Sequence, residues 1–266
     1  CASDKKANVE VKISGASDST EVVVAKLSIN QMVVVDTLYV KGEKVSYSAP
    51  CVAGCPDFYY FLNNDKKVVS LVLQEGDQIK VVADLDGNVS SIEGSEESKK
   101  FSAMDQQFDE TFAKFNSLVK QIDQLQGVKN SAAKQKELNR ELNSVYVNHK
   151  KEAIKYLYTN SKSISVIPVM YQRLGSELMV FGDINDVYLF KNVYDSLRTV
   201  YPASPYVASL ADDITRRESM IGLNKKIEAV SEMNYPDISL YDQNAKARNL
   251  SELDGKVIIL SFWSIT

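Results

Sequence analysis

The stretch Val9-Glu10-Val11-Lys12-Ile13 alternates apolar and polar side chains, which is the period of a strand with one buried face. Short runs of β-branched and aromatic residues follow it, and turn residues such as Glu75-Gly76-Asp77 and Asp86-Gly87-Asn88 separate several of them. These runs cover residues 22–27, 32–40, 45–47, 58–62, 68–73 and 79–85. Short strands at this spacing predict an antiparallel β-sandwich or barrel over residues 9–94.

The pattern changes at Gly94-Ser95, after which apolar residues recur every three or four positions. This spacing predicts a long amphipathic helix that ends near Gly127, and a second long helix over residues 131–158. A short loop between two long helices indicates an antiparallel pair. Shorter helices are predicted over residues 166–174, 186–200 and 204–230. We therefore expect a helical segment over residues 95–233 and an α+β protein with more than one domain.

The composition excludes several classes of function. The chain has 266 residues with a formal net charge of -4, which argues against nucleic acid because phosphate binding needs clustered Lys and Arg. No apolar run approaches the roughly 18 residues of a membrane-spanning helix. The single histidine, His149, is expected to be a packed residue of the second long helix. We therefore expect no histidine-based triad, no metal site and no cofactor.

The last stretch of the sequence has the pattern of a third domain. After Pro236, residues Asp237 to Tyr241 predict a short strand, and Leu250-Ser251-Glu252-Leu253 predicts a helical turn. The apolar run Val257-Ile258-Ile259-Leu260-Ser261-Phe262 is typical of a strand that is buried on both faces of a sheet. Trp263 follows this run directly.

This last stretch resembles the opening of a thioredoxin-like domain of the redoxin (AhpC-TSA) and thiol-disulfide oxidoreductase class. The motifs Ile13-Ser14-Gly15, Glu75-Gly76-Asp77-Gln78-Ile79-Lys80-Val81 and Gly94-Ser95 resemble the uncharacterised, DUF4369-like β domain of lipid-anchored bacterial thioredoxin-like proteins. The resemblance implies that residues 234–266 are the incomplete first part of the thioredoxin-like domain.

The same resemblance places the catalytic Cys-x-x-Cys pair just after Thr266, with Trp263 flanking it. In such folds the redox cysteine lies at a helix N-terminus, which stabilises its thiolate. We accordingly expect no catalytic residue within this chain, and we expect the chain to be inactive alone.

The opening Cys1-Ala2-Ser3-Asp4-Lys5-Lys6 looks like a bacterial lipoprotein after signal-peptide removal. Cys1 would carry the lipid, and residues 1–8 would form a polar tether. The expected location is extracytoplasmic, with the lipid holding the protein in the bacterial cell envelope, in the periplasm or at the outer membrane.

Cys51-Val52-Ala53-Gly54-Cys55 contains a cysteine pair with a glycine between its members. A local disulfide that pins a loop and a redox-active pair that exchanges with the active site are both open interpretations. The spacing does not fit Cys-x-x-Cys-His haem attachment, and no second pair completes a zinc site.

Two classes of function follow. In the first, the chain is the recognition or scaffold portion of an extracytoplasmic thiol-disulfide oxidoreductase, whose partners are a disulfide-containing protein client and an upstream thiol reductant. In the second, it is a non-enzymatic lipoprotein that binds a partner or forms a homodimer through the long helices, with a degenerate thioredoxin-like domain.

Overall fold

The computed structural model describes residues 6–29, 31–175, 178–231, 238–253, 255–257 and 259. The chain divides into two compact units, with the boundary between Thr215 and Arg216 inside helix α5 (Pro205–Ser231). Only the backbone is described over residues 226–231 of that helix. Each unit is described below by itself.

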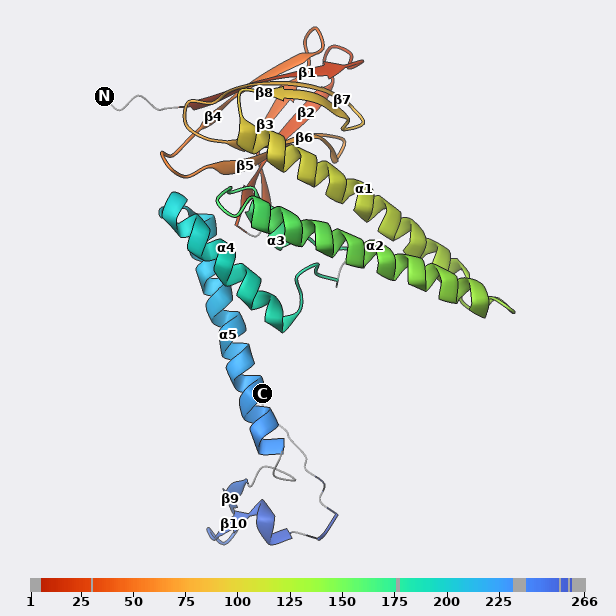
Figure 1. The fold of residues 1–266 in the computed structure, drawn as a ribbon, viewed down its shortest axis with the longest axis vertical. Helices are drawn as coiled ribbons and strands as arrows, with labels where there is room; N and C mark the ends of the chain where they lie inside the picture. The colour runs from red at the N-terminus through yellow and green to blue at the C-terminus, as the bar shows by residue number, and fades with distance from the viewer. Residues whose placement is uncertain are drawn as a thin grey trace. The chain divides into compact units, whose positions relative to one another are not determined.

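The first unit begins with two four-stranded sheets (Figure 1). One has the order β4-β1-β7-β8 and contains β1 (Lys6–Ser14), β4 (Lys44–Pro50), β7 (Gln78–Asp84) and β8 (Val89–Glu93). The other has the order β3-β2-β5-β6 and contains β2 (Glu21–Ser28), β3 (Gln31–Tyr39), β5 (Asp57–Asn63) and β6 (Lys66–Leu73). Neighbouring strands are antiparallel except β1 and β7, which run parallel. The predicted α+β fold with an N-terminal sandwich-like domain is confirmed, while β8 was not predicted.

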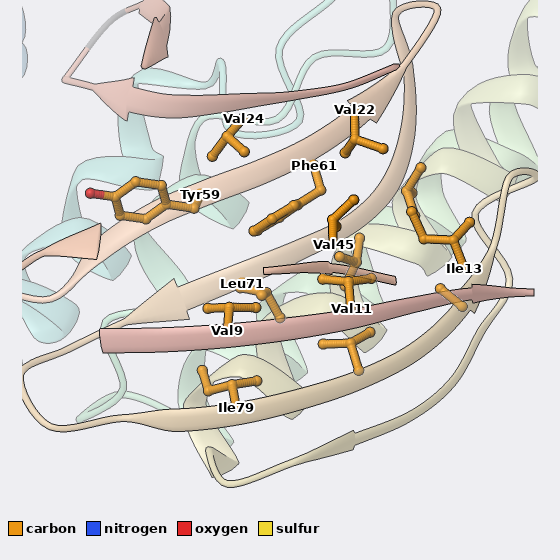
Figure 2. Close-up of a cluster of buried hydrophobic side chains, with 14 of the residues drawn as sticks. Val9, Val11, Ile13, Val22, Val24, Val45, Tyr59, Phe61, Leu71 and Ile79 are labelled. Atoms are coloured by element: carbon orange, nitrogen blue, oxygen red, sulfur yellow. The ribbon is translucent and has the colours of Figure 1, made fainter. Parts of the chain in front are cut away.

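The core lies between the two sheets (Figure 2). The alternation predicted for β1 is confirmed, because Val9, Val11 and Ile13 are at most 2% exposed. They face Tyr59 and Phe61 of the other sheet across this core. Burying each such side chain contributes roughly 1.5–3 kcal/mol, so this layer supplies much of the driving force for folding.

A helical layer covers the outer face of β5 and β6. Helix α1 (Glu96–Gln124) begins at Ser95, whose hydroxyl accepts the backbone N–H of Ser98. The ring of Phe101 in α1 packs against Phe58 and Tyr60, with ring centroids 5.2 and 5.9 Å apart. These two strands are therefore buried on both faces, which explains why they read as continuous apolar runs.

Gly94 makes the entry into α1 possible. Its φ is 90°, and a Cβ at this position would lie 2.0 Å from the carbonyl oxygen of Gln78 in β7. Only glycine allows the backbone to pass this close to β7 and turn into the helix. The Gly94-Ser95 pair is thus a local structural requirement of the junction.

Helix α2 (Ala132–Thr159) packs along α1, and the two run antiparallel as predicted (Figure 1). The remaining helices of the unit are α3 (Val166–Met170), η1 (Ile184–Asp186), α4 (Val187–Val200) and the first part of α5. In the described part of the chain, no helix is both long enough and apolar enough to cross a membrane.

The second unit contains a two-stranded antiparallel ribbon of β9 (Ser239–Tyr241) and β10 (Ala247–Asn249), followed by η2 (Leu250–Leu253). The predicted short strand and helical turn are present, and β10 was not predicted. The strand expected over residues 257–262 is not found at its two described residues, because Val257 and Ile259 have irregular backbone and are 96% and 90% exposed. A strand buried on both faces needs neighbours, and the described residues of this unit offer only the ribbon. The other four residues of that run, like Trp263, lie outside the described residues.

Candidate functional site: the exposed strand β3

Strand β3 exposes apolar side chains along most of its length. Met32, Val33, Val34 and Val35 are between 39% and 62% exposed, and Tyr39 is 57% exposed. A strand of a sandwich usually buries one face in the core, so β3 departs from the other strands of its sheet. We call the nine residues Gln31–Tyr39, together with their backbone N–H and C=O groups that point away from β2, the β3 edge.

The pairing with β2 assigns each β3 residue to a face, because directly paired residues share a face of the sheet. Asp36 pairs with Val24, which is fully buried in the core, so Asp36 lies on the inner face. Val34 pairs with Ala25, which lies on the opposite face. A register shift leaves Val35 between them without a partner, and such a bulge bends the strand locally.

The other three edges of the two four-stranded sheets are protected. On β6, both backbone groups of Val72 bond to Ser98 of α1, the N–H at 3.1 Å and the C=O at 2.7 Å. Strand β4 carries Lys44 at its start and ends at Pro50, while β8 has only five residues. Covering elements, lysine, proline and short length all hinder the addition of another strand.

No comparable protection is found at the β3 edge within the part of the chain that the structure describes. The strand contains no lysine and no proline, and it pairs only with β2 on one side. One local bond is made there, from the Thr37 N–H to the Asp36 carboxylate at 2.8 Å. The edge is therefore a template on which an extended chain could form backbone hydrogen bonds.

Asp36 lies near Tyr47 of β4. Burial raises the pKa of the Tyr47 hydroxyl, and the negative charge of the nearby Asp36 carboxylate raises it further. The Tyr47 ring in turn contacts Tyr59 and Phe61, at 5.8 and 6.2 Å between ring centroids. The inner face of the β3 edge thus combines one carboxylate with a cluster of aromatic rings.

The strands behind β3 are held firmly. The Tyr206 hydroxyl of α5 donates to the Leu27 carbonyl at 2.5 Å and bonds to Asp57 at 3.1 Å. Lys26 forms an ion pair with the same Asp57 at 2.7 Å and lies 5.9 Å from the centre of the Tyr59 ring. These contacts tie β2 and β5 to the helical layer, so the β3 edge belongs to a rigid support.

The two cysteines of the loop after β4 are separate thiols in this structure. The Cys51 thiol donates to the Ala49 carbonyl at 3.7 Å, and the Cys55 thiol donates to the Ala203 carbonyl at 3.3 Å. Cys55 pairs with Val52 across a turn. No disulfide joins Cys51 and Cys55 in this structure. Burial raises the pKa of Cys51, which disfavours its reactive thiolate.

His149 is buried, as predicted for a packed residue. Its Nε2 bonds to the Gln172 side chain at 2.9 Å, and its ring lies 5.4 Å from the ring of Phe108. Burial lowers the pKa of His149, so the ring is neutral at pH 7. Within the described residues, no cluster of His, Cys, Asp or Glu side chains is arranged to hold a metal ion.

A charged cluster between β6 and α1 was not predicted from the sequence. Lys67 pairs with both Asp105 and Asp109 at 2.7 Å, and Ser70 bonds to Asp105 at 2.5 Å. The two carboxylates outweigh the effect of burial, so the pKa of Lys67 is raised. A cavity of about 440 Å³ borders the cluster. Because these charges already pair with one another, the cluster acts as a joint between the sheet and the helix.

The remaining predicted positions, Cys1 and Trp263, lie outside the described residues. Residues 7–101 match the family model described as "Domain of unknown function (DUF4369)", a range that begins in β1 and ends in the first turns of α1. No curated protein and no solved structure matches the chain. The match supports the DUF4369-like part of the expected resemblance, and the thioredoxin-like part stays a prediction.

Proposed function

We propose that this chain is the recognition portion of an extracytoplasmic thiol-disulfide oxidoreductase, and that the β3 edge binds an extended segment of a disulfide-containing protein client. The observation that carries the proposal is the exposure of Met32–Val35 on an edge that lacks protection within the described residues. Strand addition gains affinity from backbone hydrogen bonds and selectivity from alternate side chains. Proteins with missing or incorrect disulfides present such extended apolar segments, because they cannot bury them.

The redox step itself belongs to the Cys-x-x-Cys pair expected from the resemblance. Its thiolate would attack a client disulfide, form a mixed disulfide and be released by the second cysteine, after which an upstream thiol reductant restores the dithiol. Cys51 is poorly suited to replace that pair, because burial raises its pKa. The 266-residue chain should therefore not accelerate the reduction of insulin by dithiothreitol. Acceleration that disappears in a Cys51→Ala, Cys55→Ala variant would contradict this division of roles.

The binding experiment uses a fluorescent, reduced and carboxymethylated protein, which is unfolded and contains no disulfide. Val34→Lys places a charge on the outer face of the β3 edge, where Val34 is 62% exposed. We expect the dissociation constant to rise about tenfold or more, as for the loss of a central interface contact. Ser46→Lys, at an exposed position of edge strand β4, is the matched control and should bind as the wild type does.

Two outcomes would contradict the proposal. One is that the wild-type chain does not bind the unfolded protein. The other is that Val34→Lys and Ser46→Lys bind it equally well. Thermal unfolding of both variants, followed by circular dichroism, shows whether a loss of binding reflects a loss of fold.

The proposed location is the bacterial cell envelope, with a lipid on Cys1 as the anchor. Mass spectrometry of the membrane fraction tests for the lipid, and Cys1→Ser provides the control. A Cys1→Ser protein that stays in the membrane fraction would argue against this anchor.

The alternative, a dimerisation module, has one supporting observation. The α1–α2 pair extends past the sheets (Figure 1), and Phe112 and Val147 on the helices and Val128 in the connecting loop are between 37% and 51% exposed. A homodimer through these helices should sediment as twice the monomer mass and should dissociate on Val147→Glu. A monomer across the micromolar range would leave recognition at β3 as the better account.

A further inference from the structure

We infer that the β3 edge selects extended segments that carry a lysine or arginine opposite Asp36, and that Asp36 disfavours pairing of two copies of this chain through β3. This inference rests on the proposed function, since it names the chemistry of the segment that the β3 edge accepts. It makes Asp36 a specificity-determining residue.

Asp36 stands out because of its surroundings. It is the one charged residue of β3, and it lies directly after the apolar run Met32–Val35. No ion pair with Asp36 is formed by the residues that the structure describes, and its carboxylate accepts a hydrogen bond from the neighbouring Thr37 N–H. An added strand would therefore meet an apolar surface that contains a single negative charge.

Strand addition changes the environment of this carboxylate. Asp36 lies on the inner face near Tyr47, so a strand paired with β3 would remove part of its water. Removing water from a charge costs free energy unless an opposite charge replaces the lost interaction. Side chains directly opposite each other in adjacent strands have Cβ atoms about 4.5–5.5 Å apart, which suits a lysine or arginine.

Tyr47 adds a second reason for a cation. Its ring is half-buried, whereas Tyr59 and Phe61 behind it are fully buried, so a lysine or arginine can pack its charged group over the Tyr47 ring. An acidic side chain at the same place would face repulsion from Asp36 and no attraction from the rings. The difference in binding affinity between a basic and an acidic segment is thus larger than the ion pair with Asp36 alone would give.

A second copy of this chain is a poor occupant of the β3 edge. Because β3 contains no lysine or arginine, β3 paired with itself leaves both Asp36 carboxylates without a cation from either strand, in any register. The register centred on Asp36 places the two carboxylates directly opposite each other, which is destabilising. A charge within an edge strand is a known means of limiting edge-to-edge association.

The test measures the binding of three labelled nine-residue peptides to the full 266-residue chain by fluorescence anisotropy. The peptides share a Thr/Val-rich sequence and differ only at the central position, which is Lys, Gln or Glu. We expect the Lys peptide to bind the wild type roughly two- to tenfold more tightly than the Glu peptide at low salt, from the usual size of cross-strand charge pairs. The preference should shrink at about 0.5 M salt because exposed charges are screened.

Two substitutions at the same position complete the design. Asp36→Asn should reduce the preference for the Lys peptide to the part that the Tyr47 ring supplies, and Asp36→Lys should prefer the Glu peptide. Asp36→Asn should also self-associate more than the wild type in sedimentation at high protein concentration. Because Asp36 is exposed, both variants are expected to unfold at the wild-type temperature.

The outcomes distinguish a failure of the inference about Asp36 from a failure of the proposed function. Peptides that all bind equally well to the wild type, but fail to bind Val34→Lys, would overturn the inference and leave the proposed function intact. A preference for Lys that is as large in Asp36→Asn as in the wild type would overturn it as well, as would a wild-type dimer that Val34→Lys dissociates. If no peptide and no unfolded protein binds, the proposed function fails and the inference fails with it.

Discussion

Strands β6 and β3 are the two edges of one sheet, and their surroundings are opposite. In β6, Leu71, Val72 and Leu73 are fully buried, and Ser98 of α1 satisfies the outward backbone groups of Val72. In β3, the side chains of Met32–Val35 are exposed, and apart from the pairing with β2 the described residues add one local bond, from the Thr37 N–H to Asp36. The helical layer thus closes one edge of the sheet and leaves the other open. The comparison suggests that β6 contributes mainly to stability and β3 mainly to binding.

The largest loss of stability should come from truncating a buried side chain of the closed edge, β6. Leu71→Ala removes a fully buried side chain of β6 and should lower the free energy of unfolding by about 2–5 kcal/mol. Val34→Ala, a truncation on the open edge, should change it by less than about 0.5 kcal/mol. Urea unfolding of the first unit, monitored by circular dichroism, measures both values. Equal losses for the two variants would remove the contrast between the edges.

The joint between β6 and α1 should show the next largest effect. Lys67→Met leaves the carboxylates of Asp105 and Asp109 without their cation. Removing one partner of a fully buried ion pair lowers the free energy of unfolding by about 3–5 kcal/mol. The Lys67 side chain is 27% exposed, so we expect a loss of roughly 1–3 kcal/mol. Lys66→Met is the matched control, because Lys66 pairs with Asp86 at the surface.

This prediction has a characteristic pH dependence. Without Lys67, the loss of stability should shrink as the pH falls and the Asp109 carboxyl group becomes protonated. Burial raises the pKa of Asp109 even in the presence of Lys67, so this recovery should begin above the usual range for an aspartate. A loss of stability that does not vary between pH 7 and pH 4 would contradict the role given to the ion pairs.

Acid should also weaken the helical layer through His149. Its pKa in the folded state is lowered by burial, whereas in the unfolded chain it is near the ordinary 6.5. The unfolded state therefore binds more protons below pH 6.5, and stability is lost as the pH falls from 6.5 toward the folded pKa. The slope cannot exceed about 1.4 kcal/mol per pH unit for one proton.

Unfolding measured between pH 7.5 and pH 5 tests this loss, with His149→Gln as the comparison. The variant has no titrating ring and should show a flatter profile over this interval. The β3 edge contains no histidine, so its peptide affinity should change little over the same interval for the folded protein.

Much of the fold follows from local sequence patterns, and the contrast between the edges does not. The alternation in β1 and the Gly94-Ser95 junction mark the strands and the start of α1 directly. The runs Met32–Val35 in β3 and Val68–Leu73 in β6 are both rich in β-branched and aliphatic residues, so either could have been the buried edge. What separates them is the distant helix α1, which depends on tertiary packing and leaves no mark in either strand.

The candidate site was missed for the same reason. Sequence reasoning directed attention to the cysteines and to the final stretch, whose chemistry is recognisable from residue type. The β3 edge consists of ordinary apolar residues, and only their exposure makes them notable. The one signal that could have indicated it is Asp36, a charge next to four apolar residues in a predicted strand.

The smallest expected effect on stability is also the sharpest test of the open edge. Val34→Lys should change the free energy of unfolding by less than about 0.5 kcal/mol, because a lysine at this exposed position can extend into water. The same variant should stay soluble to higher protein concentrations than the wild type, since lysine on an edge strand opposes edge-to-edge pairing. Ser46→Lys on β4, an edge that already carries Lys44 and Pro50, should leave solubility unchanged. A loss of more than about 1 kcal/mol for Val34→Lys would mean that Val34 is covered in solution, and β3 would then be a second closed edge.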